Sequence, residues 1–369
     1  MSLVSNLISG STGNFGLIDA KKYGHDTGAL RIATESAEAL HDIFIEGFYN
    51  MEQAELAAVH EGVALESSQY QAVVEASVAS VFAKVKEFFK KLWEKVKAFF
   101  HSVKRYIDAI FMSGKDFVKK YDADIRKATN LKDFSYKMYV YTNVDDVADV
   151  DVESLTDTVL AELSENQFKS VEDAMSIIEK LVAETGKKMT DTDAALTDDD
   201  LKIYNELSNV KVDDDVMAVQ FANAHHFKNV SEYSDIPSAC FAYFRNWAED
   251  KNDMDDVEIS SLSEYASTLK SFNSSKVDKM ASNTDKAYKN ALKRIDTLDK
   301  LISNNFEKGE VKKTATKLVS IWTSVVSTCQ NMNNTYYTAW KTAAKERDSA
   351  YKSMIVKAIA YSKKQGKKK

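Results

Sequence analysis

The sequence predicts a mainly α fold built from long amphipathic helices, with a carboxy-terminal antiparallel helical hairpin and a small α+β insert. One proline and eleven glycines in 369 residues leave few helix breakers. Apolar residues recur every three or four positions in one long stretch of the first third and in two stretches of the last third. We expect an acidic arm, a basic helix region, an acidic insert and a hairpin with a basic tail, at residues 1–66, 67–131, 132–250 and 251–369.

The first 66 residues are predicted to form a flexible acidic arm with one or two short helices. Seven of the eleven glycines fall within residues 1–62, and residues 9–16 (SGSTGNFG) have the composition of a linker. Apolar side chains return at near-helical spacing between residues 29 and 64. We expect the rest of the chain to keep its core without this arm.

A long helix with one aromatic face is predicted for residues 74–121, starting near Ser67 or Ser68. Gly114 is expected to bend the helix or to restart it before Phe117, because glycine costs about 1 kcal/mol relative to alanine in a helix interior. Ten apolar residues on one face alternate at spacings of four and three: Val78, Phe82, Val85, Phe89, Leu92, Val96, Phe99, Val103, Tyr106 and Ile110.

The opposite face of this helix is basic, with eleven Lys or Arg against four acidic residues between positions 84 and 120. Three interpretations are open: the aromatic stripe packs in the protein's own core, binds a partner in an assembly, or inserts at an anionic membrane surface. In either of the last two, the interaction would be carried by Phe82, Phe89, Leu92, Trp93, Phe99, Phe100, Lys90, Lys91, Lys95 and Lys97.

Residues 132–250 are predicted to form the α+β insert. Apolar and polar residues alternate over residues 134–144 (FSYKMYVYTNV), which predicts a strand, and residues 210–221 are its expected partner. A turn, two helices and a further helix start are predicted at residues 145–151, 154–163, 170–185 and 197–200.

The spacing of apolar residues in the last third of the chain predicts two long helices, at residues 262–306 and 311–361. Residues 307–310, which include Gly309, are the expected turn between them. Helices joined by so short a turn pack antiparallel.

Charge is distributed in blocks, with net values of −7, +7, −20 and +13 over residues 1–70, 71–140, 141–260 and 261–369. Blocks of opposite sign attract each other or face different partners. The +13 block would either contact DNA phosphates nonspecifically or neutralise the −20 block of the same chain, and we favour the second.

No motif in the sequence predicts catalysis, a cofactor or a metal site. Glycine-rich phosphate loops and nucleophile elbows are absent, and Cys240 and Cys329 do not have metal-binding spacing. The acidic residues 191–200 lack the central glycine of an EF-hand loop. His225 and His226 are adjacent and cannot share a helix face. Only a buried cluster of polar residues around them would favour an enzyme.

Two stretches follow one another in the sequence, separated by twenty residues. They are residues 63–111 (VALESSQYQAVVEASVASVFAKVKEFFKKLWEKVKAFFHSVKRYIDAIF) and residues 132–144 (KDFSYKMYVYTNV). This order of basic aromatic helix and strand after an acidic arm resembles a type of virion structural protein of large tailed bacteriophages, over about a quarter of the chain. The resemblance implies a non-enzymatic, internal head-type protein found in the virion, and in the host cytoplasm during assembly. It implies capsid or portal partners, with packaged DNA and self-association as further options.

The resemblance also implies a maturation cleavage. Some head proteins of large phages are cut after a small or aliphatic residue, any residue, and Glu. Ala64, Leu65 and Glu66 before Ser67 fit this form, as do residues 33–35 and 73–75. We hypothesise that a cut after Glu66 removes the acidic arm. The alternative function is a membrane-surface protein anchored by the helix at residues 74–121.

Overall fold

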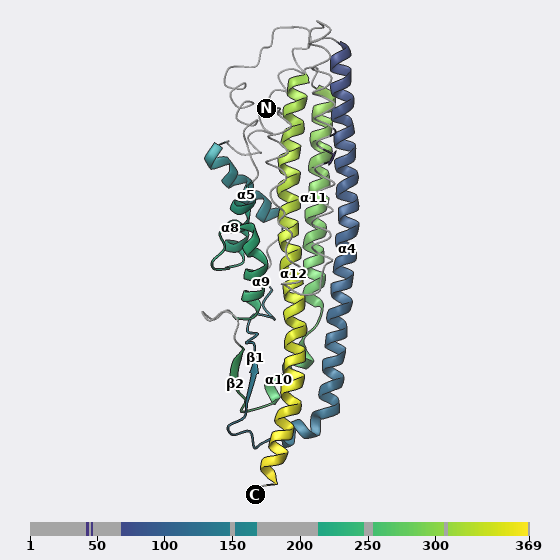
Figure 1. The fold of residues 1–369 in the computed structure, drawn as a ribbon. Coiled ribbons are helices and arrows are strands. Elements are labelled where there is room, and N and C mark those ends of the chain that lie inside the picture. The colour runs from purple at the N-terminus through teal and green to yellow at the C-terminus, as the bar shows by residue number, and fades with distance from the viewer. Residues whose placement is uncertain are drawn as a thin grey trace.

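The computed structural model describes residues 42, 43, 46, 68–147, 152–167, 213–246, 254–305 and 309–367. Within them the fold is mainly α, as predicted, with seven α-helices, a short 3-10 helix and a two-stranded sheet. Three long helices lie side by side along most of the molecule, and shorter helices lie against one side of this bundle (Figure 1).

Helix α4 (Ser68–Lys127) is the 60-residue helix predicted from the aromatic stripe, and its expected start is confirmed. At 1.5 Å per residue it is about 90 Å long. Gly114 does not restart the helix, which continues through it. A Cβ at Gly114 would lie 2.4 Å from the backbone oxygen of Leu269. The glycine therefore allows a close approach of two backbones, where sequence reasoning expected only a weak point.

The prediction of a single helix at residues 262–306 is wrong, because two helices occupy this range. They are α10 (Ser263–Ser271) and α11 (Ser275–Asn305). Between them the Oδ1 atom of Asn273 accepts a hydrogen bond from the backbone N–H of Ser275 at 3.0 Å. A bond from an Asn side chain to the backbone two residues on forms a local turn, which competes with the helical pattern.

Helix α12 (Gly309–Gly366) lies at the centre of the molecule. It packs against α4 and α11 on one side and against the shorter helices on the other (Figure 1). Every side chain from Val319 to Ala344 is buried or half-buried as a result, whether apolar or polar. The antiparallel pairing predicted for the carboxy-terminal hairpin is confirmed for α11 and α12 (Figure 1).

The shorter helices form a second group that covers α12. They are α5 (Val152–Gln167), α8 (Asp214–Ala224), the 3-10 helix η1 (Tyr233–Asp235) and α9 (Ile236–Phe244). Helix α5 contains the helix predicted at residues 154–163.

The prediction of a strand at residues 210–221 is wrong, because the helix α8 begins at Asp214. The Asp213 carboxylate accepts hydrogen bonds from the backbone N–H groups of Asp215 and Val216, at 2.9 and 3.2 Å. This N-cap signal outweighs the apolar residues that suggested a strand.

Strand β1 (Ser135–Met138) confirms only the first part of the strand predicted at residues 134–144. Its antiparallel partner is β2 (Asp255–Glu258), with Tyr136 opposite Val257. Because β2 has the sequence DDVE, its own pattern does not predict a strand. The partner of β1 therefore comes from beyond the expected insert.

Buried apolar side chains form two clusters along α12. The larger cluster joins α4, α11 and α12 to the shorter helices. Between the clusters α12 carries the charged residues 345–348, and Ala350 packs against both clusters. Each cluster combines residues from the expected regions 67–131, 132–250 and 251–369, which fold onto one another. The smaller cluster consists of Val118, Leu131, Met138, Ile259, Leu262, Ala266, Leu269, Met354, Ile355, Ala358 and Ile359.

Several predictions lie outside the described residues. These are most of the arm at residues 1–66, the helix at 170–185, the helix start at 197–200, residues 307 and 308 of the turn at 307–310, and the latter part of the turn at 145–151. Gly309, predicted to lie in the turn, is instead the first residue of α12.

We expect Gly114→Ala to destabilise the fold by about 1–3 kcal/mol, because the new methyl group would meet the backbone of α10. This loss should exceed the gain in helix propensity of about 1 kcal/mol. Urea unfolding followed by circular dichroism measures the change. Gly366→Ala is the matched control, since a Cβ there meets nothing within 4 Å. A Gly114→Ala variant as stable as the wild type would contradict the close contact.

Candidate functional site

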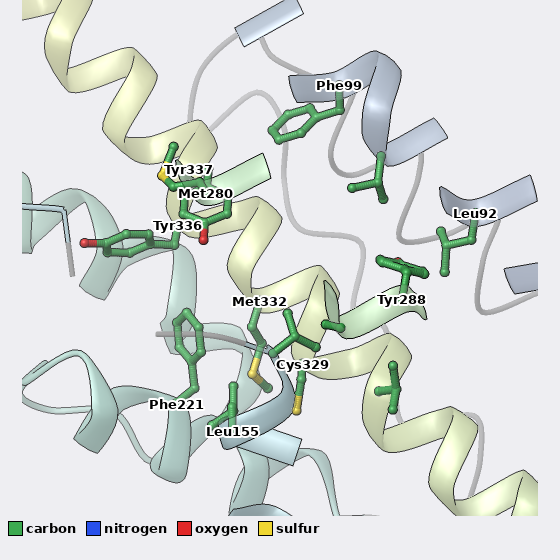
Figure 2. Packing of buried hydrophobic residues seen from close by; sticks show 14 of the residues in the cluster. Leu92, Phe99, Leu155, Phe221, Met280, Tyr288, Cys329, Met332, Tyr336 and Tyr337 are labelled. Atoms are coloured by element: carbon green, nitrogen blue, oxygen red, sulfur yellow. The ribbon is translucent and has the colours of Figure 1, made fainter. Parts of the chain in front are cut away.

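The aromatic residues predicted to form an interaction surface on α4 lie in the protein's own core. Trp93 is half-buried and stacks on Tyr288 of α11, with 5.2 Å between ring centroids. Figure 2 shows Leu92 and Phe99 of α4 beside residues of α11 and α12. These side chains cannot contact a partner or a bilayer while the bundle is closed. The buried members of the predicted set are Phe82, Phe89, Leu92, Phe99 and Phe100.

Most lysines along the middle of α4 have acidic partners on the same helix or on α11. Lys91 pairs with Glu87 and Lys97 pairs with Glu94, both at 2.6 Å. Lys90, Lys91 and Lys95 are exposed, whereas Lys97 is half-buried and also lies over the Trp93 ring, 5.1 Å from its centroid.

Two lysines of α4 bind acidic residues of α11 and so tie the two helices together. Lys86 pairs with Asp296 at 2.9 Å and also with Asp299. Lys104 pairs with Asp278 at 2.5 Å. Charge neutralisation of α4 therefore comes partly from α11, which lies inside the block with net charge +13. Residues 148–151, 168–212 and 247–253 of the −20 block lie outside the described residues, and the neutralising role of the block as a whole stays a prediction.

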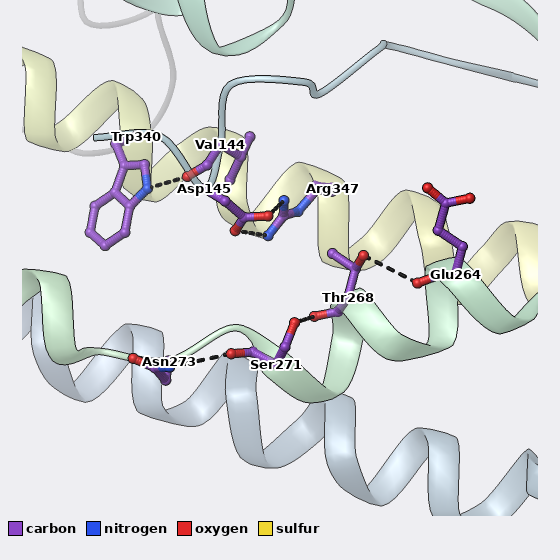
Figure 3. A network of polar contacts seen from close by, with 8 residues as sticks. All are labelled: Val144, Asp145, Glu264, Thr268, Ser271, Asn273, Trp340 and Arg347. Carbon is purple, nitrogen blue, oxygen red and sulfur yellow. Dashed lines mark hydrogen bonds and ion pairs between the residues drawn. The ribbon is translucent and has the colours of Figure 1, made fainter. Parts of the chain in front are cut away.

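A polar seam crosses the molecule between the two buried clusters (Figure 3). Arg347 of α12 is 5% exposed and binds both carboxylate oxygens of Asp145, at 2.9 and 3.0 Å. About two turns away on α12, the indole N–H of Trp340 donates to the backbone oxygen of Val144 at 2.8 Å. Together these bonds fix the segment after β1 onto α12. Asp145 lies in a turn there, with its side chain 62% exposed, and pairs with the buried Arg347.

His225, at the end of α8, lies in an aromatic cage. It is 1% exposed, and its ring centroid lies 4.4 Å from that of Phe221 and 4.2 Å from that of Tyr336. Phe227 also stacks on the His225 ring, with 5.3 Å between centroids. Burial lowers the pKa of His225 from 6.5 to about 3, although the nearby Asn333 side chain favours the protonated form. The imidazole is therefore neutral at physiological pH.

Buried polar residues do surround His225, which is the arrangement that would favour an enzyme. The nearby part of α12 carries Gln330, Asn331, Asn333 and Asn334, each at most 2% exposed. However, neither nitrogen of His225 has a hydrogen-bond partner. An imidazole that acts as a base must lie within hydrogen-bonding reach of a nucleophile or substrate. In the described structure the imidazole of His225 is enclosed by aromatic rings and makes no hydrogen bond.

A hollow of about 380 Å³ lies beside the adjacent His226. This is within the size range of small-ligand sites. His226, Ser238 and Asp235 all line it, but the Asp235 carboxylate accepts hydrogen bonds from Ser231 and from the backbone N–H of Glu232. The Ser231 backbone bond is the main reason that the pKa of Asp235 is lowered. Asp235 therefore stabilises the loop before α9 and does not orient His226.

The acidic triplet at the start of α8 has structural roles. Asp213 caps the helix, and Asp215 accepts a hydrogen bond from the backbone N–H of Tyr233 at 2.9 Å. Asp214 is half-buried, and burial raises its pKa from 3.8 to about 6. The acidic residues 191–200 lie outside the described residues.

In the parts of the chain that the structure describes, His, Cys, Asp and Glu do not gather in groups of three that could hold a metal ion. Cys240 and Cys329 are buried and free, and burial raises the pKa of Cys329 to about 12, so that its thiol stays protonated. None of the described helices has the length and apolar content needed to cross a membrane.

No protein-family model, curated protein or solved structure matches this chain.

We expect acidification from pH 7 to pH 5 to destabilise the fold through His225. Its folded pKa is about 3, against 6.5 in the unfolded chain, so only the unfolded chain takes up the proton in this range. The loss from this group is roughly 2 kcal/mol. Asp214 works in the opposite direction, because its raised pKa makes the folded state the better proton acceptor.

Urea unfolding of the wild type and of His225→Leu, each at pH 7 and pH 5, isolates this contribution. The variant should become less sensitive to acid by roughly 2 kcal/mol. His101→Leu, which removes an exposed histidine of α4, is the control and should behave as the wild type. If His225→Leu keeps the acid sensitivity of the wild type, the cage does not exclude the proton.

We expect Arg347→Lys to cost about 2 kcal/mol in unfolding free energy, because lysine cannot bind both oxygens of Asp145 and would be buried with fewer bonds. Arg126→Lys is the matched control: Arg126 is 77% exposed and pairs with Asp122 on the surface, where the expected cost is below about 0.5 kcal/mol. Chemical denaturation measures both. Equal losses would show that the seam contributes no more than a surface pair.

Proposed function

We propose that this chain is a non-enzymatic structural component of a tailed bacteriophage particle, internal to the head or associated with it. The resemblance in residues 63–144 supports the particle assignment. The observation that carries the structural role is the bundle of α4 and α12, which are 60 and 58 residues long and pack along a shared aromatic core. A bundle of this length is suited to spanning and bracing an assembly.

The use of buried polar groups supports the same proposal. Arg347 and Trp340 make bonds that hold segments of the chain together. His225 is enclosed by aromatic rings and lacks hydrogen bonds. These polar side chains define how helices pack, which is what a rigid building block requires.

The alternative of a membrane anchor on α4 loses its main support. An interfacial helix binds by burying its apolar face in the lipid. In α4 that face contacts α11 and α12 instead, for example through Phe89 and Trp322, whose ring centroids are 6.2 Å apart. Anchoring would require the bundle to open and expose its core to water during binding.

Mass spectrometry of gradient-purified particles from the encoding phage tests the proposal. Peptides from residues 68–367 should co-sediment with capsid and portal peptides at a constant ratio across the particle peak. A phage protein that acts only in the infected cell serves as the control and should be lost on purification. If this chain is lost in the same way, it is not a particle component.

The same peptides test the cleavage hypothesis. Ala64, Leu65, Glu66 and Ser67 lie outside the described residues, directly before α4 begins at Ser68. Glu46 of the arm pairs with Lys84 of α4 at 2.6 Å, so removal of the arm would free a basic group. A cut after Glu66 predicts a non-tryptic peptide that starts at Ser67. Recovery of residues 1–22 from mature particles would contradict it.

A further inference from the structure

The lysines of this protein differ in how they are neutralised along the bundle. In the middle of α4, Lys86, Lys97 and Lys104 have acidic partners. Near the carboxy-terminal ends of α4 and α12 many lysines do not. We call this region the basic end. Its exposed lysines without an ion pair in the described structure are Lys119, Lys120, Lys127, Lys132, Lys364 and Lys367.

Direct contacts bring the two parts of the basic end together. The hydroxyl of Tyr361 donates to the backbone oxygen of Lys132 at 2.9 Å. Lys363 pairs with Asp124 at 2.9 Å. Figure 1 shows the final turns of α12 beside the end of α4, at one tip of the molecule. Lysines from positions far apart in the sequence therefore form one surface.

The local charge balance favours an anionic partner. Residues 115–134 and 357–367 hold ten Lys or Arg against four Asp. Two of these carboxylates are used in pairs, Asp124 with Lys363 and Asp122 with Arg126. The three acidic residues of β2 lie alongside β1, where Asp256 is opposite Lys137.

Compensation of helix dipoles explains only part of this cluster. Basic residues in the last turn of a helix stabilise its negative end. Arg126 and Lys127 have this position in α4, as do Lys363 and Lys364 in α12. Lys119, Lys132 and Lys367 lie outside those last turns and have no such role.

The basic end lacks the features that a protein or single-stranded partner would require. Protein interfaces centre on apolar and aromatic anchors, and single strands stack on exposed aromatic rings. Here Tyr136 and Tyr361 are half-buried, and their hydroxyls bond to Ser353 and to Lys132. Lysines alone suit a regular array of phosphates.

We propose that the basic end binds the phosphate backbone of duplex DNA without sequence preference. This inference rests on the proposed role in a DNA-filled particle and names the surface that would contact the DNA. With six lysines in contact, the logarithm of the binding constant should fall with the logarithm of salt concentration with a slope of about −5.

Fluorescence anisotropy with the purified full-length chain and a labelled 30-base-pair duplex of arbitrary sequence tests the proposal over a range of salt concentrations. Replacing Lys127, Lys132 and Lys364 with Gln should reduce the slope by about 3 and weaken binding at least about tenfold at low salt. The control replaces Lys90, Lys91 and Lys95 with Gln, which changes the net charge equally on an exposed part of α4, and should leave the slope nearly unchanged. Circular dichroism verifies that both variants are folded.

Equal weakening by the two triple variants would overturn the proposal, because any positive charge would then suffice. Tighter binding to a single-stranded oligonucleotide, or flotation with anionic vesicles without binding to duplex DNA, would overturn it as well. A chain that fails to bind DNA but is present in purified particles would contradict this inference alone. A chain that binds DNA but is absent from particles would contradict the proposed structural function and not the chemistry of the basic end.

Discussion

The contact between the aromatic face of α4 and the central helix α12 is the constraint on which the rest of the fold depends. Phe100 and Tyr337, with ring centroids 5.6 Å apart, are typical of it. Fully burying a side chain of this size contributes about 1.5–3 kcal/mol, and the contact repeats along two long helices. Because α4 and α11 cover only one side of α12, the shorter helices are needed to cover the other.

The long helices could be predicted from the sequence because their apolar stripes repeat over many turns. Shorter elements depended on single local bonds or on distant partners. Asp213 starts α8 and Asn273 separates α10 from α11, and each does so through one side chain that a periodic pattern cannot reveal. Strand β2 exists because β1, more than a hundred residues earlier, pairs with it. Local alternation cannot specify such a partner.

The candidate sites were only partly predictable for a related reason. Periodicity identified which side chains of α4 share a face, but the partner that covers this face comes from the far end of the chain. His225 carried no local signal of burial, since its cage is completed by Tyr336, 111 positions away. The polar residues of α12, such as Asn333, are enclosed because helices pack on both sides of it. Burying amides in one register disfavours sliding of one long helix past another.

The polar seam between the two clusters has a consequence for how the chain is placed. Along residues 345–348 of α12 the apolar core is interrupted, and the ion pair of Arg347 and Asp145 takes its place. The bonds from Arg347 to Asp145 and from Trp340 to Val144 have fixed directions, whereas apolar contacts do not. The seam therefore fixes how the segment after β1 is placed along α12, while the apolar clusters on either side supply most of the cohesion.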